Sequence, residues 1–327
     1  MKKHKIRKGL LVIYVLILIL GAKNISCYEG KRDKSQTKTE NFQNTLTDEQ
    51  LINKFYRICE DLNLNVPFKG TNEKILIEKN YYAEAGLGVA RLKIPDILRI
   101  KFNLNNEQVL SIINEYAGAK LGEKPLYKPL ITEKEATEKA IEYLKKIGIK
   151  EGDYNLKLVK SKFYEKEGEW SFFWERYYKQ YKYYQDRVDL SFGETYGIIA
   201  YGNHCLSKIP PTIEVKISEQ KAKEIAAQYA NDLIMSNKVD ISSGKTFKNR
   251  FYGYKIGGVF SARLSIVTPN YLLSDKSTWG TDKLSLDTRL AWIISFEVNS
   301  KRMPVPGEIF LLIDANTGER LGGSFTL

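Results

Sequence analysis

The chain has 327 residues, of which 43% are hydrophobic and 12% aromatic, so it holds enough apolar side chains for a core and is not a fully disordered chain. Its 51 Lys and Arg residues outnumber its 39 Asp and Glu residues, and the formal charge of +12 would suit nucleic acid or a membrane surface as a partner. This length allows two or three domains of about 100–200 residues each.

The first 26 residues are typical of an export signal. Five basic side chains among residues 1–8 precede an apolar run from Gly9 to Ala22, and no acidic side chain occurs before Cys27. The 14-residue run spans about 21 Å as a helix, short of the roughly 30 Å hydrocarbon core of a bilayer. We therefore expect residues 1–26 to be a signal peptide or a signal anchor. The chain that follows carries +6 and is expected outside the cytoplasm, where nucleic acid is not a partner.

Cys27 is a candidate lipidation site. The tract Asn24-Ile25-Ser26-Cys27 resembles a bacterial lipobox, in which the cysteine carries the lipid. Simple cleavage with release and an uncleaved anchor are the alternatives. Residues 27–45 are polar and nearly free of apolar side chains, so we expect a disordered tether that holds the body roughly 20–25 Å from a membrane anchor. The expected location is extracytoplasmic, either anchored to the cell membrane or secreted.

Three segments share one helical pattern: residues 46–62, 131–144 and 217–230. The last two align without gaps at an offset of 86 residues, and the first lies 85 residues earlier. Each opens with an apolar residue and then Thr or Ser, the usual N-cap, and apolar residues recur afterwards at helical spacing. The sequence therefore predicts three amphipathic helices at equivalent places of a repeated unit.

Strand-like sequence follows each predicted helix and ends in a hairpin signal. The clearest example is the alternating run from Ile309 to Ile313, after which Asp314 can bond back into its own turn and Gly318 accepts a positive φ. One helix followed by an antiparallel sheet, three times over, predicts an α+β fold of tandem repeats. The expected boundaries are a degenerate repeat 1 at 46–117, repeat 2 at 130–208, and repeat 3 at 213–327 with an insertion at 238–290.

These repeated segments resemble the PepSY domain and the related YcdB/YcdC-type extracytoplasmic repeats. The resemblance rests on the helix Ser218–Tyr229 with its Ala-x-x-Ile-Ala pattern and on the closing segment IFLLIDANTGERLGG from Ile309. The middle copy adds Trp170-x-Phe172-x-Trp174-Glu175-Arg176. The sequence departs from the family at the insertion 238–290, because a simple PepSY unit is compact.

This resemblance implies a secreted or surface module of the kind found in the propeptides of thermolysin-like proteases, where it inhibits the enzyme and assists its folding. The module contributes no catalytic residues. We therefore expect a non-enzymatic cell-surface protein that binds an exported protein or peptide, such as a protease, and modulates it.

The residues themselves also argue against an enzyme. His204 is the one histidine after Cys27, and its neighbour Cys205 would point to the opposite side of an extended segment. No H-E-x-x-H, G-x-S-x-G or Walker motif occurs, so we expect no catalytic, cofactor-binding or metal-ligating residue. Cys59 lies on the apolar stripe of the first predicted helix, where a buried free thiol is the default and a Cys59–Cys205 disulfide the alternative.

The aromatic segment Trp170–Tyr184, WSFFWERYYKQYKYY, allows two interpretations. A hairpin of strands 169–177 and 182–192 would place Trp170, Phe172 and Trp174 together on one face as core. Alternatively, exposed rings would bind a peptide by strand addition or stack on a cell-wall sugar, which makes a glycan-binding wall protein the alternative function. The candidate binding surface then consists of Trp170, Trp174, Arg176 and Tyr178.

Overall fold

The computed structural model describes residues 46–64, 75–82, 86–123, 128–149, 152–235, 238–240, 246–248, 254–270, 286–299 and 307–326. The chain divides into two compact units, Met1–Gln43 and Asn44–Leu327, and every described residue lies in the second unit. The predicted signal segment 1–26, the candidate lipidation site Cys27 and the tether 27–45 lie outside the described residues. Within the described ranges, no helix is long and apolar enough to cross a membrane.

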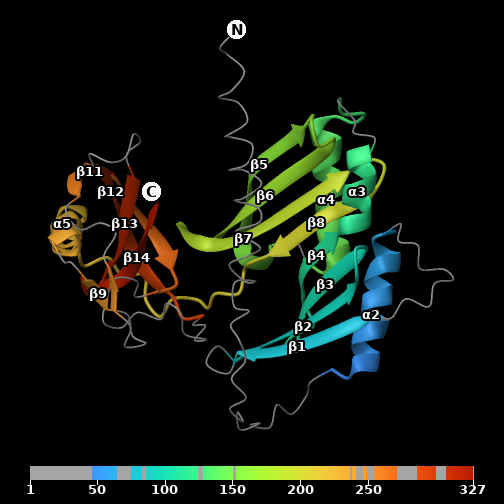
Figure 1. Ribbon diagram of the computed structural model, residues 1–327, viewed down its shortest axis with the longest axis horizontal. Helices are drawn as coiled ribbons and strands as arrows, with labels where there is room; N and C mark the ends of the chain where they lie inside the picture. The colour runs from blue at the N-terminus through green and yellow to red at the C-terminus, as the bar shows by residue number, and fades with distance from the viewer. Residues whose placement is uncertain are drawn as a thin grey trace. The chain divides into compact units, whose positions relative to one another are not determined.

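Four helices lie in the described ranges (Figure 1), and Thr47 and Thr132 cap two of them as the sequence predicts. They are α2 (Asp48–Asp61), α3 (Glu115–Glu123), α4 (Glu133–Ile147) and α5 (Glu219–Met235), with a short 3₁₀ turn η2 (Asp153–Asn155). Thr47 and Thr132 each accept a hydrogen bond from the backbone of the residue three positions on, whose side chain bonds back to the cap. These reciprocal bonds satisfy orphan N–H groups at the start of α2 and α4.

The strands after α2 and after α4 form one continuous antiparallel arrangement, the first sheet. Its strands are β1 (Leu76–Tyr82), β2 (Leu87–Ile94), β3 (Leu98–Asn103), β4 (Val109–Asn114), β5 (Leu156–Tyr164), β6 (Glu169–Tyr178), β7 (Tyr181–Gly193) and β8 (Gly197–Asn203). Their order is β1-β2-β3-β4-β8-β7-β6-β5. Two four-stranded meanders therefore join through their last strands, where Ile112 lies opposite Tyr201. The sequence predicted a sheet for each repeat. Instead, β4 pairs with β8, so the two meanders share one sheet and neither of these strands is an exposed edge.

The strands after α5 form a second antiparallel layer. They are β9 (Lys238–Asp240), β10 (Thr246–Lys248), β11 (Lys255–Val267), β12 (Arg289–Asn299), β13 (Gly307–Asp314) and β14 (Arg320–Thr326). Strands β11 to β14 pair in chain order, β9 pairs with β10, and one parallel bridge between Ile266 and Tyr183 connects β11 to β7. The α+β class predicted from the sequence is confirmed, with a sheet that is almost entirely antiparallel.

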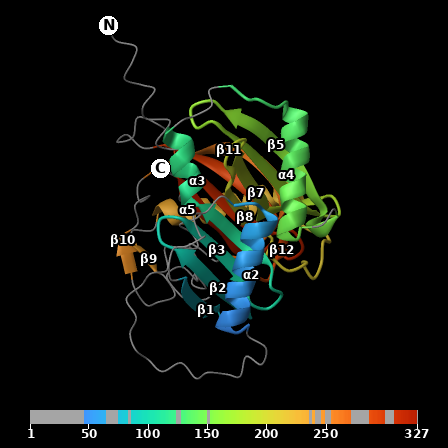
Figure 2. The same ribbon diagram turned by 90° about the vertical axis from the view of Figure 1, so that its right-hand side faces the viewer.

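Helices α2 and α4 pack on one face of the first sheet and enclose the main core (Figure 2). Leu51 and Phe55 of α2 and Ala136 and Ala140 of α4 are fully buried against strand residues such as Ile100. Alternation along each strand sends every second side chain to the opposite face of the sheet. That opposite face is polar on β2 and β3, where it carries Arg91, Lys93, Arg99 and Lys101.

The turn between β13 and β14 forms around the two residues that the sequence singles out for it. The Asp314 carboxylate accepts hydrogen bonds from the backbone N–H groups of Asn316 and Thr317 at 2.8 and 2.9 Å. Gly318 has φ of +78°, and its N–H donates to the Asp314 carbonyl at 2.9 Å. Because a Cβ at this φ is strained, glycine suits the position better than other residues.

Candidate functional site

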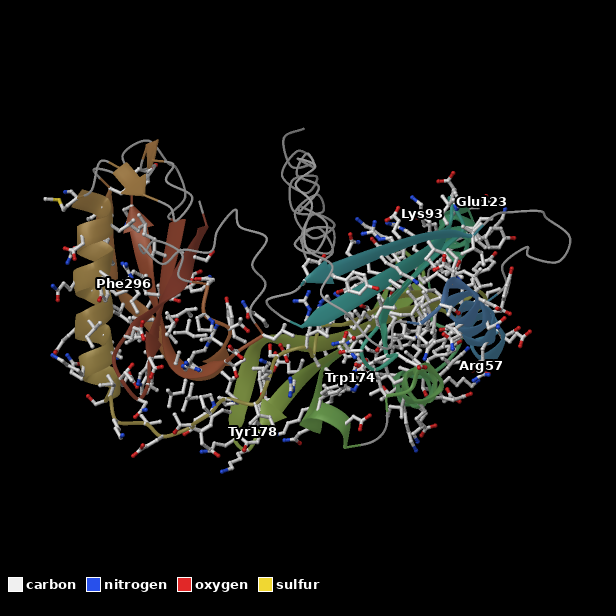
Figure 3. All side chains as sticks on the ribbon, turned by 90° about the horizontal axis from the view of Figure 1, so that it is seen from below. Arg57, Lys93, Glu123, Trp174, Tyr178 and Phe296 are labelled. Atoms are coloured by element: carbon white, nitrogen blue, oxygen red, sulfur yellow. The ribbon has the colours of Figure 1, made fainter. Side chains whose placement is uncertain are left out.

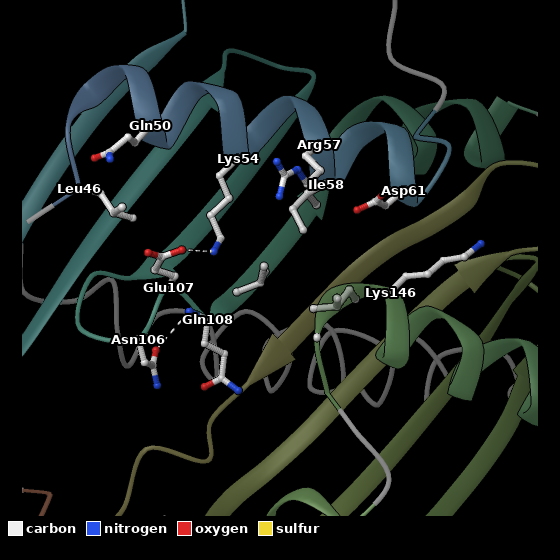
Figure 4. Close-up of a pocket in the computed structure, with 13 residues that line it drawn as sticks. Leu46, Gln50, Lys54, Arg57, Ile58, Asp61, Asn106, Glu107, Gln108 and Lys146 are labelled. Atoms are coloured by element: carbon white, nitrogen blue, oxygen red, sulfur yellow. Dashed lines mark hydrogen bonds and ion pairs between the residues drawn. The ribbon is translucent and has the colours of Figure 1, made fainter.

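A cleft of about 580 Å³ opens on the helix side of the first sheet (Figure 4). We call it the α2–α4 cleft; α2 forms one wall, and the β3–β4 turn and the C-terminal end of α4 form the other. Its volume lies within the roughly 300–1,000 Å³ that small-molecule sites occupy. Its lining residues are Leu46, Gln50, Lys54, Arg57, Ile58, Asp61, Asn106, Glu107, Gln108, Val109, Lys146, Ile147 and Gly148.

The α2 wall is one polar stripe of the helix. Gln50, Lys54, Arg57 and Asp61 recur every three or four residues, which places them on the same face. Lys54 reaches across the cleft to Glu107 in the β3–β4 turn, with its amine 3.0 Å from the carboxylate. This ion pair links the two walls at one point and leaves the rest of the stripe facing the opening.

The opposite wall is held in shape by local hydrogen bonds. Asn106 accepts a bond from the backbone N–H of Gln108 at 3.1 Å, and the Gln108 side-chain amide bonds the Tyr154 hydroxyl at 2.7 Å. Gly148 has φ of +100° and ends α4, because its N–H turns back to the last carbonyls of the helix. Both segments are therefore positioned before any ligand arrives.

The charges of the cleft leave one guanidinium available. Lys54 is paired with Glu107, and Lys146 is paired with Glu142 at 2.7 Å. Arg57 is exposed and makes no ion pair with any residue that the structure describes. Buried apolar side chains, including Ile58 and Val109, line the cleft beside these charges. An acidic group with an apolar neighbour would match this combination.

The aromatic hairpin forms, but two of its rings do not make the predicted binding surface. Trp170 and Trp174 retain only 4% and 6% of their exposure, and both stack on the fully buried ring of Phe172. Trp170 also donates to the Glu194 carboxylate at 2.8 Å. The exposed interpretation of these two rings is wrong, because strand alternation turns them toward the face that the helices cover. Tyr178 is half-buried and packs beside Tyr183.

Arg176 is a buried structural residue rather than part of an open surface. Its side chain is 11% exposed, and its guanidinium lies 2.6 Å from Asp186, whose side chain is 2% exposed. The same group donates to the Ser207 carbonyl at 2.7 Å and lies over the ring of Tyr183 at 4.2 Å. Because the guanidinium has partners on several sides, it fastens the segment after β8 to strands β6 and β7.

His204, Cys59 and Cys205 are the only histidine and cysteines among the described residues. His204 lies 3.2 Å from Asp189, and no described hydroxyl or thiol hydrogen-bonds its ring. Among the described residues, no group of three His, Cys, Asp or Glu side chains is placed to hold a metal ion. Cys59 and Cys205 are both free and buried. Burial, with a smaller effect of Glu60, raises the pKa of Cys59 to about 12, so this thiol is a poor nucleophile at neutral pH.

Sequence reasoning missed the α2–α4 cleft. The apolar stripe of α2 indicates core, whereas the polar stripe at Gln50, Lys54, Arg57 and Asp61 lines the cleft. Its regular spacing was the available signal. The second wall comes from residues 106–108 and 146–148, and nothing in the sequence pattern brings those segments next to α2.

Comparisons with known proteins add a distant likeness among solved structures. No family model matches the sequence, and no curated protein matches it. Among solved structures, the chain is similar to the Bacillus megaterium YpeB C-terminal domain, with 15% sequence identity, coverage of 87% of this chain and 100% of that chain, and a TM-score of 0.39. At that score the likeness carries no argument about fold or function.

Proposed function

We propose that this chain is a non-enzymatic binding protein of PepSY-like repeats, tethered or released outside the cytoplasm, that holds a segment of an exported protein in the α2–α4 cleft. A protease is the partner class that the sequence resemblance suggests, and binding would modulate its activity. The observation that carries the proposal is the cleft itself, with a preformed wall on each side and, at its opening, Arg57, which has no ion pair among the residues that the structure describes.

The chemistry of the cleft favours an acidic peptide segment as the ligand. Arg57 offers a planar donor group for a carboxylate, while the side-chain NH2 groups of Gln50 and Asn106, whose oxygens accept bonds within the chain, can donate to a peptide carbonyl. The apolar side chains of Ile58 and Val109 would lie against an aliphatic neighbour. A segment with one Asp or Glu beside an apolar residue satisfies all three features.

Strand addition at β5 fits the structure less well. Among the described strands β5 pairs only with β6, which makes it an edge of the first sheet, but its register shifts between Leu158 and Lys160. The same strand carries lysines at positions 157, 160 and 162. Bulges and lysines are devices that protect an edge from pairing with another chain. The cleft is therefore the better site for a partner segment.

The test compares the full chain with an Arg57→Glu variant in binding to exported proteases. Secreted proteases are incubated with each protein, and their cleavage of a fluorogenic peptide is measured alongside direct binding. We expect wild type to alter at least one protease and Arg57→Glu to bind it at least tenfold more weakly, because the variant places a carboxylate where the ligand carries one.

Lys134→Glu is the matched control, since Lys134 is an exposed residue of α4 outside the cleft. This variant changes the net charge by the same amount and is expected to bind like wild type. Equal loss in both variants would mean that overall charge, and not the cleft, drives binding. If no exported protein binds wild type, the proposed function is wrong.

A further inference from the structure

Four cationic side chains form a square on the face of the first sheet opposite α2 and α4. Arg91 and Lys93 lie on β2, and Arg99 and Lys101 lie on β3; we call these four residues the cation square. They alternate with buried core residues such as Leu92 and Ile100, so they project from the other face. Figure 3 shows Lys93 on the side of the strands away from α2, which carries Arg57.

The register places like charges directly opposite each other. Arg91 lies opposite Lys101, and Lys93 lies opposite Arg99. Cβ atoms of such antiparallel partners are about 5 Å apart, and residues two apart on one strand are about 7 Å apart. Arg91 is drawn toward Glu78 on β1 and Arg99 toward Glu115 of α3, and both guanidinium groups stay close enough to Lys101 to repel its charge. Like charges in opposite positions destabilise a sheet, so this arrangement favours an anion between them.

The neighbouring carboxylates neutralise only part of this charge. Glu78 on β1 lies 3.0 Å from Arg91 and 3.8 Å from Lys93. Glu115, the first residue of α3, lies 2.6 Å from Arg99. Lys101 makes no ion pair with any described residue. Four cations beside two carboxylates leave a local charge of +2.

Two further observations favour binding of an anion at this face. The Nε atom of Arg99 is buried and has no hydrogen-bond partner in the described part of the chain. The pKa of Lys101 is lowered to about 8, first by burial and then by repulsion from Arg91 and Arg99, against a smaller opposing effect of Glu78. An unpartnered donor and a lysine whose charged form is disfavoured lie in the same square, and a bound anion would favour the charged form of Lys101.

We propose that the cation square is a binding site for a phosphate group, carried either by free phosphate or by a phosphate-bearing polymer. A tetrahedral dianion matches the local charge and can accept hydrogen bonds from several of the four head groups at once. The site lies on the opposite face of the sheet from the α2–α4 cleft, so the phosphate proposal does not depend on the proposed function.

The test measures thermal unfolding of the full chain in inorganic phosphate and in sodium chloride at matched ionic strength. We expect phosphate to raise the melting temperature of wild type and Lys101→Met to weaken phosphate binding at least tenfold. In the absence of phosphate, Lys101→Met should melt above wild type, because the substitution removes a repelled charge and keeps the apolar stem.

Lys162→Met is the matched control. Lys162 lies on β5, where it is opposite Ser171, and β5 is at the other edge of the first sheet from the strands that carry the cation square. It should bind phosphate like wild type. If phosphate stabilises wild type no more than chloride does, or if the two variants bind phosphate equally, the proposal is wrong. Binding of polyphosphate is measured in the same way to distinguish the two sources of the phosphate group. An affinity at least tenfold above that of inorganic phosphate indicates a polymer, and an equal affinity per phosphate indicates free phosphate.

A pH series with sulfate, whose charge does not change over this range, gives an independent readout. Lys101 is cationic below a pH of about 8 and loses its proton above it, so sulfate affinity should fall as the pH rises from about 7 to about 9.5. Lys101→Met should not show this fall, and the difference between the two proteins isolates this group. The charged groups around position 101, which are the same in both proteins, are Glu78, Arg91, Lys93, Arg99 and Glu115.

Discussion

Replacing Arg176 by alanine is expected to remove about 3–5 kcal/mol of unfolding free energy at neutral pH, a large part of the about 5–15 kcal/mol that is usual for a domain. The variant keeps the Asp186 carboxylate in a buried position and removes the guanidinium 2.6 Å from it. Ser207 still donates through its hydroxyl at 2.6 Å and its N–H at 3.3 Å, but it brings no opposite charge. Urea unfolding followed by circular dichroism measures the loss.

The pH dependence of this loss tests its cause. Burial raises the pKa of Asp186, although Ser207 and Arg176 lower it. Without the guanidinium this pKa rises further, so a protonated, neutral carboxyl becomes accessible at moderately acidic pH. The penalty of Arg176→Ala should therefore be smaller at about pH 4–5 than at pH 7. A penalty that is the same at both pH values would contradict the buried-charge explanation.

The double variant Arg176→Met/Asp186→Leu separates charge from packing. It removes both members of the pair and fills their space with apolar side chains, so it should lose less stability than Arg176→Ala. Such a result also covers the case in which the single variant fails to fold. If the double variant is no more stable than Arg176→Ala, the contacts of the guanidinium with the Tyr183 ring and the Ser207 carbonyl matter more than the ion pair.

Local features of this fold were predictable because their causes lie within a few residues. Thr47 and Thr132 cap their helices through bonds to residues three positions on. Asp314 accepts bonds from the backbone of Asn316 and Thr317, two and three positions on. The alternation that places Trp170 and Phe172 on one face likewise depends only on neighbours along the strand. Such patterns are readable without knowledge of the partner strands.

The α2–α4 cleft and the cation square depend on which distant segments meet. The square requires the register that sets Arg91 opposite Lys101, and the cleft requires Lys54 and Glu107, 53 residues apart, to face each other. The junction of β4 with β8 is similar, because two strand edges with no shared sequence signal pair there. Composition showed the excess of cations but gave no position at which they would gather.

Trp174→Ala is expected to cost about 3–5 kcal/mol of stability, because it removes a large core ring and leaves a cavity. The ring is 6% exposed and stacks on Phe172 at 5.8 Å, with the fully buried Val188 opposite on β7. Thermal and urea unfolding measure the loss, and reduced near-ultraviolet circular dichroism would report looser packing around the remaining rings.

Phe173→Ala is the control, since Phe173 is the next residue on β6 and projects from the opposite face, where it is only half-buried. Its loss should cost about 1 kcal/mol, because part of the ring is already in contact with water. The two variants also separate the interpretations that the sequence left open for the aromatic hairpin. A ring that served a wall glycan would lose binding to peptidoglycan with stability unchanged, whereas a core ring loses stability first. A Trp174→Ala protein as stable as wild type would therefore contradict the packing found at β6 and restore the binding surface as an explanation of this segment.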